Sequence, residues 1–244
     1  MPTKEDLLLE KRRYGLKEEI SEKELKMLEA NYPIQYIMGY VEYANIRINL
    51  NHKVLIPRYE TEELIYLIKD KYLKDNMKVL DLCCGSGFIG LALKKFNSTI
   101  NFTLSDIDTE ALEQTKENFE LNFDKNEKVK IIQSDCFTAI KEKFDLIVSN
   151  PPYVAYDDPD AQSLSLKHEP EHAIYAPDNG WYFYEKILNE APEYLNENGI
   201  LIFEINPKHI NKWIQIKNAL IIKDMSNKDR FVVLHRKDLL SLNN

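Results

Sequence analysis

The residues best suited to chemistry form the tetrapeptide Asn150-Pro151-Pro152-Tyr153, which directly follows the apolar run 144–149. Proline fixes φ and lacks a backbone N–H, so two adjacent prolines remove two donors from this turn. The side-chain oxygen of Asn150 and the carbonyl of Pro151 remain as acceptors for the two N–H bonds of a planar NH2 group. Tyr153 is expected to pack on the flat face of that group.

An NH2 group held in this way would present its nitrogen to an electrophile in a fixed direction, which is catalysis by positioning. An amide or aniline-like nitrogen is a poor nucleophile because its lone pair is delocalised. The same hydrogen bonds would stabilise the positive charge that develops on the nitrogen. The simpler alternative is a turn that ends a strand, since Asn-Pro and Pro-Pro are common in loops.

A second candidate is the segment 85–90, which follows the strand-like run 78–82 and matches the pattern GxGxxG. In a dinucleotide-binding enzyme such a loop admits a pyrophosphate to a helix N-terminus. Asp81, four residues before the first glycine, argues against that ligand because its charge would repel a pyrophosphate. A carboxylate there suits the ammonium and sulfonium groups of S-adenosylmethionine. Gly85 and Gly87 would let the backbone approach the methionine part of that cofactor.

Two further acidic residues follow later strand-like runs. Asp106 comes nineteen residues after Gly87 and is expected to accept hydrogen bonds from both ribose hydroxyls. Asp135 is placed near the adenine end of the cofactor, with Cys136 as an apolar neighbour of the ring. Each acidic residue taken singly is also typical of a helix N-cap or a turn. Together with the glycine loop they favour a cofactor, because ligands of doubly wound sheets bind at the carboxyl ends of strands.

The elements that would position these residues alternate regularly from residue 77 onward. Alternating strands and helices predict a Rossmann-like α/β fold with a mostly parallel, doubly wound sheet. About seven residues separate the last two strands, too few for a helical crossover, so these two should form an antiparallel hairpin. The predicted strands are 78–82, 100–105, 129–133, 144–149, 200–205, 219–223 and 231–235, and the helices are 87–96, 109–121, 181–195 and 207–218.

The first part of the chain has a different organisation. Residues 4–14 and 21–30 read as short helices, the second beginning with a capping-box pattern at Ser21. Apolar alternation predicts a β-hairpin with strands at 46–50 and 54–56, and helical spacing follows over 60–73. We therefore expect residues 1–57 to form an N-terminal region of helices and a hairpin, and residues 58–244 to form the catalytic domain.

Composition narrows the function classes. The formal net charge of −8 argues against direct nucleic-acid binding, since proteins that hold duplex phosphates usually carry a basic excess. Three cysteines without a CxxC pair or nearby histidine indicate reduced thiols, a cytoplasmic location and no metal site. The charged N-terminus lacks the apolar core of a signal peptide, and no apolar run approaches the roughly 20 residues that span a bilayer.

Several segments together resemble the glutamine methyltransferases that modify peptide chain release factors, often called PrmC or HemK. The segment Leu55-Ile56-Pro57-Arg58-Tyr59-Glu60-Thr61-Glu62 is the most discriminating. The tetrapeptide alone is less specific, because it also occurs in methyltransferases that act on DNA adenine or ribosomal RNA guanine. The resemblance covers about residues 33–236 and includes the segments 33–39, 133–137, 147–153 and 169–180.

The resemblance implies that S-adenosylmethionine lies along Cys83, Cys84, Gly85, Ser86 and Gly87, and also contacts Asp106, Cys136 and Asn150. It implies that the glutamine of a Gly-Gly-Gln loop in a release factor contacts residues 150–153 and is methylated on its side-chain nitrogen, N5. Arg58 and Glu60 are candidates for substrate binding; their alternative is an ion-paired start to the helix over 60–73. A ribosomal-protein glutamine, a nucleic-acid amine and a non-enzymatic cofactor-binding domain remain the competing readings.

The family usually has a longer helical domain before the hairpin, which contributes to docking of the release factor, so residues 1–57 are expected to be a shortened substrate-docking region. Two further departures from the family pattern concern single segments. His168 stands where arginine is common, and residues 204–206 read Glu-Ile-Asn where glycine is common at the third position. Neither departure is expected to touch the proposed methyl-transfer geometry.

Overall fold

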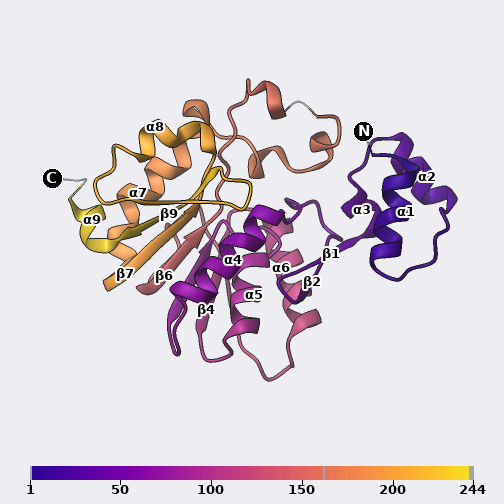
Figure 1. The fold of residues 1–244 in the computed structure, drawn as a ribbon. Helices are drawn as coiled ribbons and strands as arrows, with labels where there is room; N and C mark the ends of the chain where they lie inside the picture. The colour runs from indigo at the N-terminus through magenta and orange to yellow at the C-terminus, as the bar shows by residue number, and fades with distance from the viewer. Residues whose placement is uncertain (1, 162, 242–244) are drawn as a thin grey trace.

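A seven-stranded sheet forms the centre of the molecule in the computed structural model, which describes residues 2–161 and 163–241 (Figure 1). The strand order is β5-β4-β3-β6-β7-β9-β8. The first five of these pair in parallel, and β9 is antiparallel to both β7 and β8. This confirms the predicted α/β fold and its antiparallel terminal hairpin. The strands are β3 Lys78–Leu82, β4 Asn101–Asp106, β5 Lys130–Gln133, β6 Phe144–Ser149, β7 Leu195–Glu204, β8 Leu220–Lys223 and β9 Asp229–His235.

Helices cover both faces of the sheet because successive residues of a strand point to opposite sides. In β3, Val79 packs into one core and Leu80 into the other. The first core lies under α4 (Tyr59–Lys71), α5 (Phe88–Phe96) and α6 (Thr109–Asn122). The second lies under α7 (Tyr182–Tyr194), α8 (Ile210–Trp213) and α9 (Arg236–Leu240), on the other side of the sheet in Figure 1.

Three short helices form a separate unit at the N-terminus, set to one side of the sheet in Figure 1. They are α1 (Lys4–Arg13), α2 (Glu22–Glu29) and α3 (Ile34–Met38). The first two were predicted, and both begin with a capping box, at Thr3 and Ser21. Their own small core consists of Leu7, Leu28 and Ile37.

The β-hairpin uses the predicted strand 46–50 as its second strand, and its partner strand precedes this run and does not follow it. Its strands are β1 (Tyr40–Tyr43) and β2 (Ile46–Asn49). Ala44 and Asn45 form the turn with φ of 47° and 60°, the left-handed values that suit a two-residue hairpin. The predicted second strand, 54–56, does not form, although Val54 and Ile56 are buried in the main core. Because the hairpin shares that core, the division of the chain at residue 57 remains a proposal.

One predicted helix is much shorter than expected. In place of a helix over 207–218, the chain forms a 3-10 turn, Pro207–His209, and then the four-residue α8. Only His209 and Trp213 are buried in this stretch, so no continuous apolar face holds a longer helix against the sheet.

The segment between β6 and α7 crosses the carboxyl ends of the strands and has no α-helix among its described residues. It contains four 3-10 turns, at Pro159–Ala161, Leu166–His168, Glu171–Ala173 and Asp178–Gly180. His168 joins this segment to the N-terminal helices, because its ring stacks on Tyr32 at 3.8 Å and its Nε2 donates to the carbonyl of Ala30 at 2.8 Å. Within the described ranges, no helix combines the length and apolar character needed to cross a membrane.

Candidate active site

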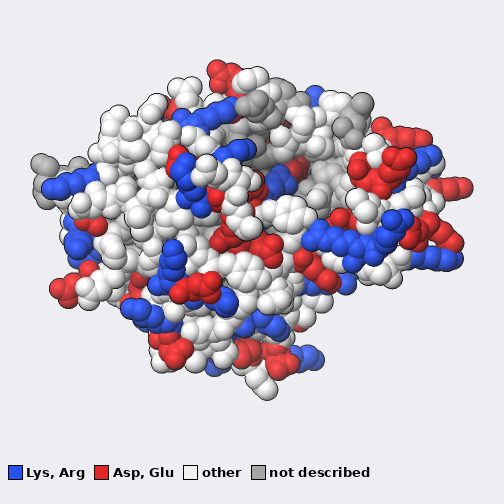
Figure 2. Space-filling view, in the orientation of Figure 1, with Lys and Arg blue, Asp and Glu red and all other residues white. Residues whose placement is uncertain are grey.

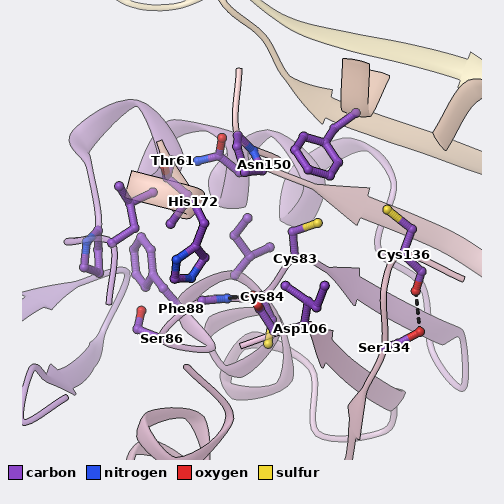
Figure 3. Close-up of a pocket in the computed structure, with 18 of the residues that line it drawn as sticks. Thr61, Cys83, Cys84, Ser86, Phe88, Asp106, Ser134, Cys136, Asn150 and His172 are labelled. Carbon is purple, nitrogen blue, oxygen red and sulfur yellow. Dashed lines mark hydrogen bonds between the residues drawn. The ribbon is translucent and has the colours of Figure 1, made fainter. Parts of the chain in front are cut away.

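A cavity of about 310 Å³ opens at the carboxyl ends of β3, β4, β5 and β6 (Figure 3). Each of these strands, or the loop directly after it, contributes side chains that the sequence had singled out. The structure therefore brings residues from four separate segments to one site, as expected for the ligand edge of a doubly wound sheet. Its walls include Ile56, Thr61, Cys83, Cys84, Gly85, Ser86, Phe88, Asp106, Ile107, Ser134, Asp135, Cys136, Asn150, Pro152, His172 and Phe183.

The glycine loop after β3 is held from behind by α6. The hydroxyl of Thr115 donates to the carbonyl of Gly85 at 3.0 Å, and Nδ2 of Asn118 donates to the carbonyl of Ser86 at 2.9 Å. A Cβ on Gly85 would meet no atom within 4 Å, so its backbone is open to a ligand. Gly87 does not line the cavity; its φ of 80° begins α5, and a Cβ there would lie 3.0 Å from Thr115.

Asp106 provides a carboxylate on the cavity wall. Its Oδ2 accepts the N–H of Gly85 at 2.8 Å, and its Oδ1 accepts the N–H of Asp108 at 3.0 Å. Each carboxylate oxygen keeps a second lone pair that a ribose hydroxyl can use. Burial raises the pKa of this carboxyl above its ordinary value, and the two backbone donors oppose that shift.

Asp81 departs from its predicted role. The side chain is only 1% exposed and does not line the cavity, because its position in the strand turns it toward the first turn of α5. Its Oδ2 accepts the N–H of Gly90 at 2.8 Å, while Oδ1 has no partner among the described residues. Burial raises its pKa to about 7. In this position Asp81 connects β3 to α5 through a hydrogen bond and does not contact a ligand in the cavity.

Another part of the cavity wall consists of the thiols of Cys83 and Cys136 and the ion-paired Asp135. A hydrogen bond with Cys136, together with burial, raises the pKa of the Cys83 thiol, so this side chain is neutral. Asp135 lies 2.8 Å from the ammonium of Lys186, which offsets its charge. Among the described lining residues there is no Lys or Arg side chain. The acidic residues on the cavity wall, Asp106 and Asp135, therefore favour a cationic ligand over an anionic one.

A second cavity of about 440 Å³ adjoins the first. Leu55, Asn150 and Ala173 line both cavities, so Asn150 lies at their junction. Pro151 and Tyr153 face only the second cavity, and Pro152 faces only the first. Figure 2 shows the molecule hollowed beside the segment that follows β6, with Lys and Arg side chains at the rim. Basic residues that line the second cavity are Arg58, Lys208, Lys228 and Arg230.

Arg58 and Glu60, the predicted substrate-binding pair, have different surroundings. Arg58 lines the second cavity and forms an ion pair with Glu169 at 2.7 Å, so its partner is not an acidic residue of the helix start. Glu60 lines neither cavity. Glu62 accepts the N–H of Ala44 at 2.7 Å and so holds the hairpin turn.

Sequence reasoning missed two residues that contact the tetrapeptide. Thr61 lies beside Asn150 at one end of the first cavity, with Asp106 toward the other (Figure 3), and accepts the Nδ2–H of Asn150 at 3.3 Å. Contrary to the expectation for residues 204–206, Glu204 accepts the hydroxyl proton of Tyr153 at 3.0 Å. For Thr61, the one signal in the sequence was its place within the discriminating segment 55–62. Glu204 lies at the end of a strand, and its contact with Tyr153 arises only when the chain folds.

Comparison with known proteins agrees with this geometry. A family model described as "Methyltransferase small domain" matches residues 61–166. The release factor glutamine methyltransferase of Streptococcus pneumoniae is 36% identical, over 91% of this chain and 84% of that protein. A ribosomal protein uL3 glutamine methyltransferase from Francisella tularensis is 37% identical, over 71% of this chain and 56% of that protein.

The fold is also similar to that of solved methyltransferases. A 16S rRNA methyltransferase from Thermus thermophilus, solved with AdoMet and guanosine, has a TM-score of 0.59 at 17% identity, over 80% of this chain and 49% of that one. At this identity the likeness concerns the fold alone. The release factor glutamine methyltransferases at 34 to 36% identity carry the assignment. The chain belongs to the family of release factor glutamine methyltransferases and is a methyltransferase.

Proposed function

We propose that the protein transfers a methyl group from S-adenosylmethionine to the side-chain nitrogen, N5, of the glutamine in the Gly-Gly-Gln motif of a peptide chain release factor. The observation that carries this proposal is the position of Asn150 on the walls of both cavities. A methyl donor in the first cavity and an amide in the second would meet at this side chain.

The first cavity fits S-adenosylmethionine. Its volume falls within the range of about 300–1,000 Å³ that is common for ligand sites. Phe88, Ile107 and Cys136 offer apolar surface for a nucleoside, and Asp106 offers acceptors for its hydroxyls. When bound, the cofactor supplies an electrophilic methyl group on a sulfonium.

The tetrapeptide supplies the orientation of the substrate nitrogen. Asn150 uses Nδ2 to donate to Thr61, so its Oδ1 is the atom left to accept an N–H bond from the substrate. The Pro151 carbonyl is the expected second acceptor, and Tyr153 borders the same cavity. Two acceptors fix both hydrogens of an NH2 group and leave its nitrogen facing the first cavity. They also stabilise positive charge on that nitrogen as the new bond forms.

Substrate class rests on the relatives and on charge. Relatives that match 89 to 91% of this chain are release factor glutamine methyltransferases, and another relative is a ribosomal protein uL3 glutamine methyltransferase. A glutamine of a ribosomal protein is therefore the second candidate. The net charge of −8 opposes a substrate held by nucleic-acid phosphates. At the rim of the second cavity, Lys208 and Arg230 are paired with Asp158 and Asp224.

We also propose a cytoplasmic location, supported by the free thiols of Cys83, Cys84 and Cys136 and by the role of release factors in translation.

The test incubates the protein with labelled S-adenosylmethionine and, in separate reactions, unmodified release factor, a release factor whose motif glutamine is alanine, ribosomal protein uL3, DNA and ribosomal RNA. We expect label on the unmodified release factor only, and its loss in Asn150→Ala. Asn97→Ala is a matched control, because Asn97 ends α5 and binds Asp75 away from both cavities. Label on nucleic acid and not on protein would contradict the proposal, and label on uL3 alone would favour the second candidate.

A further inference from the structure

Glu204, the last residue of β7, is a buried carboxylate with an exposed fraction of only 1%. No Lys or Arg nitrogen in the described part of the chain forms an ion pair with it, although the more distant Arg230 favours its charged form. A buried charge of this kind is costly unless hydrogen bonds satisfy it. Oε2 accepts the hydroxyl proton of Thr61 at 2.7 Å, and Oε1 accepts that of Tyr153 at 3.0 Å. One carboxylate thus reaches both ends of the tetrapeptide, Tyr153 directly and Asn150 through Thr61.

The direction of the hydrogen bonds in this chain is fixed by its charged end. An ionised carboxylate only accepts, so Thr61 must point its single hydroxyl proton at Glu204. The lone pairs of that hydroxyl are then available to a donor, which is Nδ2 of Asn150 at 3.3 Å. The amide of Asn150 consequently turns its Oδ1 away from Thr61. A flipped amide would place oxygen against oxygen at Thr61 and NH2 against the NH2 of a substrate.

Hydrogen bonds in such a chain also strengthen one another, because each donor is polarised by the next acceptor. Negative charge on Glu204 therefore makes Oδ1 of Asn150 a better acceptor. That oxygen is the atom expected to hold the substrate N–H while positive charge grows on the nitrogen. The two effects, orientation and polarisation, both depend on the hydroxyl of Thr61.

We propose that Thr61 and Glu204 are positioning residues for methyl transfer, which fix the amide of Asn150 with its carbonyl oxygen toward the substrate NH2. This inference rests on the proposed function for its kinetic consequences, although the orientation of the amide itself does not. It assigns a role to the threonine of segment 55–62 and to the end of β7, neither of which touches the substrate nitrogen.

The proposal predicts a dependence on pH. Burial raises the pKa of Glu204, with hydrogen bonds from Thr61 and Tyr153 opposing the shift. The other charged or titratable groups around it are Arg230 on β9, Glu60 on α4 and Tyr184 on α7, whose hydroxyl donates to the Glu204 backbone. The active form is the ionised one, so kcat should fall as pH decreases through the raised pKa of Glu204. Protonation would let this group donate to Thr61 and release the amide of Asn150.

The first experiment compares Thr61→Val, Thr61→Ser and Thr103→Val with the wild type on release factor. Thr103 is the matched control, because it is 4% exposed against 5% for Thr61 and lies on β4 away from Asn150. Thr61→Val should lower kcat by about 10- to 100-fold, the range for a lost hydrogen bond in a polarised site, with little change in KM or cofactor affinity. Thr61→Ser should recover kcat to within about threefold, and Thr103→Val should match the wild type.

The second experiment measures kcat against pH for the wild type and Glu204→Gln. The kcat of the wild type should fall as pH decreases. The kcat of Glu204→Gln should be low at every pH and should not show this decrease. Because both residues act through one amide, Thr61→Val combined with Glu204→Gln should cost little more than Glu204→Gln alone. A Thr61→Val variant as active as Thr103→Val, or a Thr61→Ser variant as slow as Thr61→Val, would overturn the proposal.

Nitrogen-15 NMR of the side-chain amides separates this inference from the proposed function. In the wild type, one NH2 proton of Asn150 should exchange slowly, and Thr61→Val should make it exchange at least tenfold faster, as expected for a lost hydrogen bond. This exchange measurement needs no methyl acceptor. It therefore tests the orientation of the Asn150 amide even if release factor is not methylated. An Asn150 amide that exchanges equally fast in both proteins would contradict it.

Discussion

Nη2 of Arg58 lies 2.7 Å from Oε1 of Glu169, and the second oxygen of that carboxylate accepts the N–H of Ile56 at 2.8 Å. Glu169 is 2% exposed and comes from the segment that crosses the strand ends. One buried side chain therefore joins the segment before α4 to the segment after β6, and these two segments form walls of both cavities.

Removing the cation of this pair should destabilise the fold. Among the described residues, Arg58→Met leaves the buried Glu169 carboxylate with the Ile56 N–H as its remaining donor, and we expect a loss of about 2 kcal/mol in the free energy of unfolding. The loss is below that for a fully buried pair because the Arg58 side chain is 35% exposed. Adding Glu169→Gln, which removes the charge and keeps an acceptor, should recover about half of the loss. Urea unfolding checks both values; a stable Arg58→Met, or losses that simply add, would contradict this account.

Asp106 should control cofactor affinity. Asp106→Asn keeps one acceptor oxygen and should raise the Kd for S-adenosylmethionine about 10-fold, and Asp106→Ala about 100-fold, since charge-assisted hydrogen bonds are lost. Calorimetric titration measures both, with the exposed Glu113→Gln on α6 as control. Affinity that is unchanged in Asp106→Ala would remove this residue from the cofactor site.

Asp81 should make stability decrease as pH rises. Its pKa is raised from 3.8 to about 7 by burial, so between these values the folded state keeps a proton that the unfolded state releases. The destabilising effect is absent below about pH 4 and complete above about pH 7, where it approaches roughly 4 kcal/mol as an upper bound. Relative to Asp81→Asn, the wild type should therefore lose stability across this range. Parallel stability curves for the two proteins would show that Asp81 does not titrate there.

Gly180 should be required for the backbone of the tetrapeptide. A Cβ at this residue would lie 2.2 Å from the carbonyl oxygen of Tyr153, and its φ is 85°. Gly180→Ala should cost more than about 2 kcal/mol and reduce kcat more than about 10-fold, because Tyr153 must shift. Gly15→Ala is the matched control, since Gly15 has φ of 65° with no atom within 4 Å and should lose only about 1–2 kcal/mol. Equal effects of the two substitutions on kcat would refute the steric argument.

The parts of the fold that followed from the sequence are those that depend on local pattern. The strands of the central sheet have short apolar runs or, in β4, alternating apolar residues, and the short spacer before β9 required an antiparallel pair. The hairpin was misplaced because its turn uses Ala44 in a left-handed conformation, which alanine rarely adopts. That turn is held by Glu62, eighteen residues later, and no local signal reports such a contact.

The same distinction between local pattern and distant contacts applies to the residues of the active site. Asp106, Cys136 and Asn150 were found because each follows a strand and strand ends share one edge of the sheet. Asp81 also lies near the end of a strand, but its side chain projects from the sheet away from the cavity and is buried. Thr61 and Glu204 were missed because their contact spans 143 residues and exists only when α4 packs beside β7.

The most direct test of the central claim is mass spectrometry of unmodified release factor after incubation with the protein and S-adenosylmethionine. The account predicts the mass of one added methyl group, located by fragmentation on the glutamine of the Gly-Gly-Gln motif, and absent with Asn150→Ala. A methyl group on any other residue, or an unmodified glutamine beside a fully folded enzyme with bound cofactor, would contradict it.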